Sequence, residues 1–279
     1  PILEGTGMDQ MLKDYGVTIV DFNEGSTVSY PQGHTAKEFF VAKPVQETDA
    51  LINLCKMKTH ALERITGGVK NLYGCISGLH KAKGHTKYTN ADIFARQLID
   101  LNQLIKPRFC VMDGIVAMDG NGPTSGDPMK MKVLLLGSDP VAIDSVYCHL
   151  VHLDPQMVPT NVHGETMGFG TWREENIRLL TEGGEITMQE AVERFGNPDF
   201  NVDRKKQRGN LWNRFNNGFL RYFQKKPYIE ADKCKKCGIC VEACPVEGKA
   251  LQFKNGRRKP PVYNYHKCIR CFCCQEMCP

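Results

Sequence analysis

The chain has 279 residues, of which 41% are hydrophobic and 24% charged, and its formal net charge is +5. These values are typical of a globular protein and exclude a disordered or collagen-like chain. No apolar run approaches the roughly 20 residues of a membrane-spanning helix, so we expect no membrane span. The unusual feature is the cysteine content, because nine of the thirteen cysteines fall between Cys234 and Cys278.

Short apolar segments alternate with amphipathic ones before this cysteine-rich end. Strands are expected, in chain order, at residues 17–22, 39–42, 51–55, 109–112 and 133–136. Asn90 can cap a helix over 91–105, and Asp139-Pro140 can begin another that runs to about His152. An amphipathic segment follows at 187–195. This order predicts an α/β fold with a mixed or mostly parallel sheet.

We expect three regions along the chain. Residues 1–180 would form the α/β domain, 181–224 a helical and polar connection, and 225–279 a small α+β domain of the ferredoxin type.

The last of these regions contains a duplicated cysteine motif. Both copies follow the spacing C-x2-C-x2-C-x3-C and end in Cys-Pro, and an offset of 34 residues superimposes them. This spacing is typical of bacterial ferredoxins with two [4Fe–4S] clusters, in which the fourth cysteine of each run binds the other cluster. One cluster would use Cys234, Cys237, Cys240 and Cys278, and the other Cys268, Cys271, Cys274 and Cys244.

Zinc and disulfide bonds are the alternatives for these cysteines. Zinc sites use paired ligands from two segments rather than two four-cysteine runs. Disulfides would imply secretion, of which the sequence gives no sign. The clusters predict a cytoplasmic protein in a reducing, anaerobe-like metabolism.

The cysteine-rich end is strongly basic. From Arg221 onwards there are thirteen Lys and Arg against five Asp and Glu. Such a surface suits an acidic redox partner of the flavodoxin or ferredoxin type, although compensation for the charge of the clusters explains it equally well. Nucleic acid is not expected, because aromatic residues are not interleaved with the basic ones.

Polar residues gather after two of the expected strands of the N-terminal part. Ligands of open α/β sheets bind beyond the carboxyl ends of strands, so we expect a crevice there that faces the cluster module. The candidates for catalytic roles are His60, Lys58 and Asp113; those for binding an anionic substrate or cofactor are Lys70, Asn71, Gly67 and Gly68. Each also has an ordinary interpretation as a surface charge, capping residue or turn residue, and none of the spacings is specific.

Several of these motifs occur together in one known family. The blocks are Lys58-Thr59-His60, Thr66-Gly67-Gly68-Val69-Lys70-Asn71, Asp113-Gly114, Gly122-Pro123 and Ser138-Asp139-Pro140. In this order they resemble domain-of-unknown-function family 362, whose members are often described as iron–sulfur proteins and fused to a ferredoxin module. The resemblance implies an α/β domain with a redox association and supplies no reaction. By comparison with that family, we expect the sequence to be trimmed at both ends.

Three functions remain open from the sequence. In the first, an oxidoreductase relays electrons through two [4Fe–4S] clusters to an anionic substrate, or to an unidentified organic cofactor, in the N-terminal domain. In the second, a non-catalytic electron-transfer or cluster-assembly protein docks a client through that domain. In the third, the clusters are structural or sensory in a ligand-binding protein; two clusters in series favour electron transfer over this.

Overall fold

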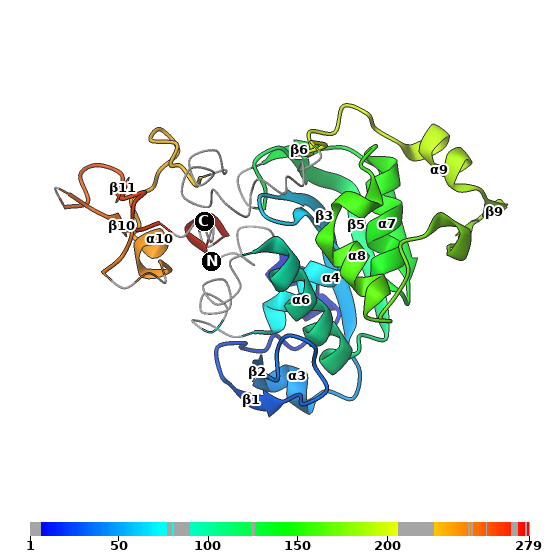
Figure 1. Ribbon diagram of the computed structural model, residues 1–279, viewed down its shortest axis with the longest axis horizontal. Coiled ribbons are helices and arrows are strands. Elements are labelled where there is room, and N and C mark those ends of the chain that lie inside the picture. Colours follow the sequence, from blue (N-terminus) through cyan, green and yellow to red (C-terminus); the bar gives the residue numbers. More distant parts are fainter. Residues whose placement is uncertain are drawn as a thin grey trace, which may run out of the picture.

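The structure is a computed structural model of the whole chain. It describes residues 7–76, 80, 90–123, 126–205, 226–244, 246, 248–254, 256–268, 273–276 and 278. Within these ranges the larger N-terminal part is an α/β unit, and the C-terminal part is a small domain of short helices and strands (Figure 1).

A mixed sheet forms the centre of the N-terminal part. Its two central strands, β3 (Ile52–His60) and β5 (Phe109–Asp119), are parallel neighbours. β4 (Arg64–Thr66) pairs antiparallel with β3, while β6 (Asp127–Met129) and β7 (Val133–Gly137) both pair antiparallel with β5. The expected α/β class with a mixed sheet is confirmed.

Four helices cover one face of this sheet: α4 (Gly68–Asn71), α6 (Ala91–Ile105), α7 (Pro140–Leu150) and α8 (Pro159–Thr166) (Figure 1). The two expected helices are confirmed together with their caps. The side chain of Asn90 accepts the N–H of Asp92, and that of Asp139 accepts the N–H groups of Val141 and Ala142. Alternate residues of β3 and β5, such as Met57 and Met112, are buried against these helices.

The opposite face of the sheet is exposed in the described part of the chain. Ile52 and Leu54 of β3 and Leu134 and Leu136 of β7 are all at least half exposed. Because side chains alternate along a strand, the exposed residues belong to one face and the buried ones to the other.

The sequence-based strand boundaries need three corrections. Residues 17–22 form no strand and are exposed, so their apolar side chains do not contribute to the core. The strand expected at 51–55 continues to His60, because β4 extends the ladder along it. The strand expected at 109–112 continues to Asp119, because β6 pairs with its second half.

The remaining N-terminal elements are smaller. They are α2 (Met8–Asp14), β1 (Gly25–Ser29), β2 (Glu38–Ala42), α3 (Lys43–Glu47), η1 (Leu72–Cys75), η2 (Pro155–Met157), η3 (Glu174–Asn176), β8 (Leu179–Thr181), β9 (Gly184–Ile186) and α9 (Met188–Phe195). β2 and α9 were expected from the sequence. A capping box of Thr187 and Glu190 begins α9.

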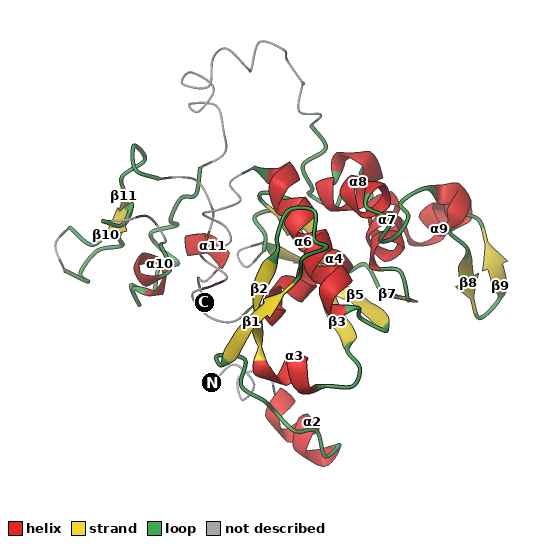
Figure 2. Ribbon diagram, turned by 60° about the horizontal axis from the view of Figure 1, so that its bottom comes forward, coloured by secondary structure: helices red, strands yellow, loops and turns green. Residues whose placement is uncertain are grey.

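The C-terminal domain consists of α10 (Ile239–Glu242), the antiparallel pair β10 (Leu251–Gln252) and β11 (Val262–Tyr263), and α11 (Cys273–Glu276). In both views α11 lies between the β10–β11 pair and the N-terminal part (Figures 1 and 2). None of the described helices has the length and apolar content to cross a membrane.

Candidate functional site

Three cysteines of the first run share a small cavity with the last cysteine of the second run. Cys234, Cys237, Cys240 and Cys278 all line it. Burial raises the pKa of Cys240 to about 11, and the neighbouring thiols of Cys278, Cys237 and Cys234 contribute to the rise. The chain turns sharply beside Cys237, where Gly238 has a φ of 92° that other residues rarely adopt.

The fourth cysteine of the first run lies apart from this group. Cys244 packs with Cys268 in one buried apolar cluster, and its Sγ accepts the backbone N–H of Ala250 at 3.3 Å. Cys274 is buried as well, and its Sγ lies 3.1 Å from the hydroxyl of Tyr263. Cys271, also expected as a ligand, lies outside the described residues.

The donors at both sites fit iron–sulfur clusters. Thiolate sulfur is the ligand of [4Fe–4S] clusters, and each group brings cysteines of both runs together. Lys233, Lys235 and Lys236 also line the first cavity, where their positive charges would offset that of cluster-bound thiolates. Among the described residues, no three His, Cys, Asp or Glu side chains are grouped as a single metal ion would need.

The sequence suggested that Lys58 and His60 lie beyond the end of a strand. The structure places both residues within β3. The His60 side chain is buried, and its Nδ1 accepts the backbone N–H groups of Leu62 and Glu63, both at 3.1 Å. An Nδ1 that accepts two hydrogen bonds carries no proton, so in neutral His60 the proton is on Nε2. Lys58 is half-buried on the same strand.

Asp113 lies in the middle of β5, and its neighbour across the ladder is Lys56. The Lys56 Nζ is 2.5 Å from Asp113 Oδ2, with both side chains about 40% exposed. Partial burial opposes ionisation, but the hydrogen bonds from Lys56 and from the N–H of Ile115 hold the pKa of Asp113 below its usual value. The Asp113 carboxylate is therefore already ion-paired with Lys56 on the open face of the sheet.

The glycine turn already holds an anion that belongs to the chain itself. Asp144 of α7 is fully buried, and its carboxylate accepts the N–H groups of Gly68 (2.6 Å) and Val69 (3.1 Å). A Cβ on Gly67 would lie 2.0 Å from Asp144 Oδ1, so the turn needs glycine there. Burial raises the pKa of Asp144 to about 7, although these two hydrogen bonds oppose the shift.

Asn71 and Lys70 occupy different surroundings on α4. The Asn71 side chain donates to Asn53 Oδ1 and to the Leu54 carbonyl, which ties α4 to β3. Lys70 is buried, with its Nζ 5.9 Å from the ring centre of Tyr73 and 5.7 Å from that of Phe94. Its charge therefore lies on the face that the helices cover.

Glu63 is a candidate functional residue that no sequence pattern indicated. This residue is fully buried in the turn between β3 and β4, and neither carboxylate oxygen has a hydrogen-bond partner among the described residues. Burial raises the pKa of Glu63 to about 8. The positive charge of Lys70 opposes this rise, and the negative charge of Asp92 adds to it. No sequence signal distinguishes it, because a glutamate between a strand and an arginine resembles an exposed turn residue.

The expected catalytic and binding residues therefore do not share one pocket. Lys70 lies near the Glu63 side chain on the covered side of the sheet, and His60 Nδ1 accepts the backbone N–H of Glu63. Asp113 instead pairs with Lys56 on the open face.

The C-terminal domain contacts the N-terminal part close to His60. The Gln275 side chain of α11 donates to Asn121 Oδ1 at 2.9 Å and lies 3.2 Å from the carbonyl oxygen of Gly122. The N–H of Gly122 in turn donates to the hydroxyl of Thr59, the residue before His60. A Cβ on Gly122 would lie 2.1 Å from the Thr59 carbonyl oxygen, so only glycine permits this approach. The short helix α11, which carries Cys274, is thus connected to β3 through the loop of Asn121 and Gly122.

Each of the two parts of the chain matches a known protein family. A family described as a domain of unknown function, DUF362, matches residues 1–149, and a 4Fe-4S dicluster domain matches residues 226–279. The chain belongs to the DUF362 family. The dicluster match implies two [4Fe–4S] clusters at the C-terminal end of this DUF362 protein.

One relative of this DUF362 protein is the "Thylakoid-associated protein sll1697" of Synechocystis sp.. The two are 33% identical over 188 residues, which are 67% of this chain and 58% of the relative. The chain thus matches less than two thirds of the relative's length. No solved structure matches the chain.

Proposed function

We propose that this protein is an oxidoreductase that passes electrons through its two clusters to an anionic substrate or cofactor at the N-terminal domain, near His60. One observation carries the proposal: Gln275, on the turn with Cys274, hydrogen-bonds the loop that packs on Thr59. Electron transfer requires the donor cluster to lie near its acceptor, and this contact supports such proximity.

The clusters would supply one electron each. The ligands of one would be Cys234, Cys237, Cys240 and Cys278, and those of the other Cys268, Cys271, Cys274 and Cys244. The grouping of Cys278 with the first run, and of Cys244 with Cys268, supports this crossed arrangement.

The protein residues would supply protons and charge beside the acceptor. His60 carries its proton on Nε2, and Glu63 is a buried carboxyl that remains protonated at neutral pH. Lys70 provides positive charge for an anionic group, and Lys58 a second amine on the same strand. In this proposal Asp113, Asn71, Gly67 and Gly68 support the fold, because each is engaged in a contact within the chain.

His60→Asn tests the proposal, because the amide keeps an acceptor for the two backbone N–H groups but loses the imidazole proton. Holoprotein is reconstituted anaerobically, checked for a flavin-type band beside the iron–sulfur absorption near 400 nm, and reduced with dithionite. Its reoxidation is then followed with a panel of anionic organic acceptors. We expect one acceptor to reoxidise wild type but not the variant, while both react equally with methyl viologen. Equal rates of wild type and variant with every acceptor would refute the catalytic role.

One observation favours the non-catalytic alternative, an electron carrier or assembly protein. The N–H groups best suited to bind an exogenous anion are bonded to Asp144. A protein that exchanges electrons with mediators and reduces no acceptor in the panel would support that function. The proposed location is a reducing compartment such as the cytoplasm.

A further inference from the structure

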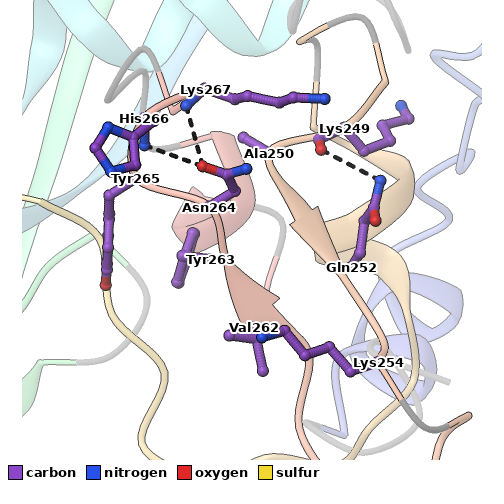
Figure 3. Close-up of a pocket in the computed structure, with 10 residues that line it drawn as sticks. All are labelled: Lys249, Ala250, Gln252, Lys254, Val262, Tyr263, Asn264, Tyr265, His266 and Lys267. Atoms are coloured by element: carbon purple, nitrogen blue, oxygen red, sulfur yellow. Dashed lines mark hydrogen bonds between the residues drawn. The ribbon is translucent and has the colours of Figure 1, made fainter.

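A groove in the C-terminal domain lies against the second group of cysteines. Its volume is about 430 Å³, and the described residues that line it include no acid (Figure 3). The lining residues are Lys249, Ala250, Gln252, Lys254, Val262, Tyr263, Asn264, Tyr265, His266 and Lys267. Three lysines and a histidine therefore surround a groove with no compensating carboxylate among these residues.

Two lining residues touch the sulfur atoms behind the groove. The Tyr263 hydroxyl lies 3.1 Å from Cys274 Sγ, and the Ala250 N–H donates to Cys244 Sγ at 3.3 Å. A single layer of residues thus separates the groove from two cysteines expected to bind one cluster. Electron transfer into that cluster from a molecule in the groove would cross a short distance.

Both sides of the groove are held in place by hydrogen bonds (Figure 3). The Gln252 amide donates to the carbonyl oxygen of Lys249 at 3.4 Å, and also to that of Gly248 at 2.8 Å, which Figure 3 does not draw. Asn264 Oδ1 accepts the N–H of His266 at 3.1 Å, and the rings of Tyr263 and Tyr265 stack with their centres 5.2 Å apart. Such a preformed surface loses little entropy when a partner binds.

The lysines of the groove differ in their availability. Lys249 Nζ donates to the carbonyl oxygens of Glu242 and Cys244, so its charge also stabilises the cysteine loop. Lys254 and Lys267 are exposed, and in Figure 3 they lie towards opposite ends of the groove. These two side chains are the ones that can meet carboxylates of a partner.

The β10–β11 pair, whose residues line the groove, lies on the side of the domain away from the N-terminal part (Figures 1 and 2). Figures 1 and 2 show α11 between the β10–β11 pair and the N-terminal sheet. Gln275 of α11 contacts Asn121 on the inner side, whereas Tyr263 of β11 reaches the same group of cysteines from the outer side. A cluster held there would have one electron-transfer route towards the N-terminal part and another towards the groove.

We propose that this groove, between Lys254 and Lys267 and backed by Tyr263, docks an acidic electron-carrier protein whose carboxylates surround its cofactor. One electron leaves the reduced partner and enters the adjacent cluster, and no covalent bond changes. The inference rests on the proposed function only in that the clusters carry electrons; it requires no chemistry at His60.

Charge reversal at the groove tests this, with an equal reversal elsewhere on the domain as control. The test variant is Lys254→Glu with Lys267→Glu. The control is Arg258→Glu with Lys259→Glu, two exposed residues outside the groove with the same total charge change. Reduced flavodoxin is the probe, and stopped-flow absorbance near 400 nm follows electron transfer into the oxidised holoprotein.

We expect the wild-type rate to fall as salt is added, because exposed charges are screened. At low salt the groove variant should be about tenfold slower or more, and the control variant should lose less than about threefold. Dithionite should reduce the clusters equally in all three proteins. If the charge reversal prevents cluster assembly, Lys254→Gln with Lys267→Gln, compared with Arg258→Gln and Lys259→Gln, provides the same comparison without added negative charge.

Several results would overturn the proposal. Equal slowing in the test and control variants would show that net charge alone matters. Saturable inhibition by millimolar inorganic phosphate would indicate a small-anion site, and a dimer that the groove variant abolishes would indicate self-association. An unchanged rate would exclude the groove outright. None of these results depends on turnover at the N-terminal domain, so the two proposals fail separately.

Discussion

Replacement of Glu63 by glutamine should change how stability depends on pH. Burial raises the pKa of Glu63 to about 8 from the ordinary 4.5. Between these values the folded chain holds a proton that the unfolded chain has released, so the contribution of Glu63 to stability is fully present below pH 4.5 and is lost as the pH rises towards 8. The free energy of unfolding loses about 1.4 kcal/mol per pH unit, or roughly 5 kcal/mol over the interval.

A glutamine side chain at this position cannot ionise, so the variant lacks this pH dependence. Between pH 5.5 and 7.5 the stability of Glu63→Gln relative to wild type should increase by roughly 2–3 kcal/mol. Urea unfolding of the anaerobic holoprotein, followed by circular dichroism and tryptophan fluorescence, measures the difference at each pH. Trp172, which packs against a core cluster near α6, is one of the chain's two tryptophans and reports on the N-terminal part.

Glu193→Gln, at an exposed position of α9, is the matched control and should show the same difference from wild type at both pH values. A relative stability of Glu63→Gln that does not vary with pH would refute the reasoning. It would mean that Glu63 is ionised in the folded chain and cannot hold a proton beside His60.

Four further predictions concern the clusters and the glycine turn. Anaerobic reconstitution should give about eight irons per chain; an iron content near four, or zinc in its place, would contradict two clusters. Cys244→Ser should damage the cluster of the second run, and loss of only the first-run cluster in electron paramagnetic resonance would contradict the crossed ligands. Tyr263→Phe removes a hydroxyl from Cys274 and should lower the midpoint potential of one cluster by roughly 20–60 mV, since one hydrogen bond contributes about 0.5–1.5 kcal/mol; an unchanged redox titration would mean that the hydroxyl does not bond the thiolate. Gly67→Ala forces Asp144 away from two backbone N–H groups and should cost roughly 2–4 kcal/mol in urea unfolding; a loss below about 1 kcal/mol would show that the carboxylate can move freely.

Local patterns in the sequence determined the cluster module and the main helices. Two runs with the same four-cysteine spacing indicate the clusters, because the first three cysteines of each run are close enough in sequence to converge on one cluster and the fourth is shared with the other run. The helix at 91–105 could be predicted to the residue, since Asn90 caps it and its apolar positions repeat at the helical period. The parallel arrangement of the two central strands followed from the order of the elements.

Strand length and the partners of polar side chains were decided by the tertiary structure. β3 and β5 continue past their apolar segments because β4 and β6 provide hydrogen bonds that no local pattern shows. Gly67 and Gly68 resembled an anion-binding turn, and they do face a carboxylate, but it comes from Asp144, about 75 residues further along the chain. Glu63 became a candidate only because the fold buries it near Lys70 without a hydrogen-bond partner among the described residues. Burial and long-range contacts depend on the packing of the whole chain, and a local sequence pattern contains neither.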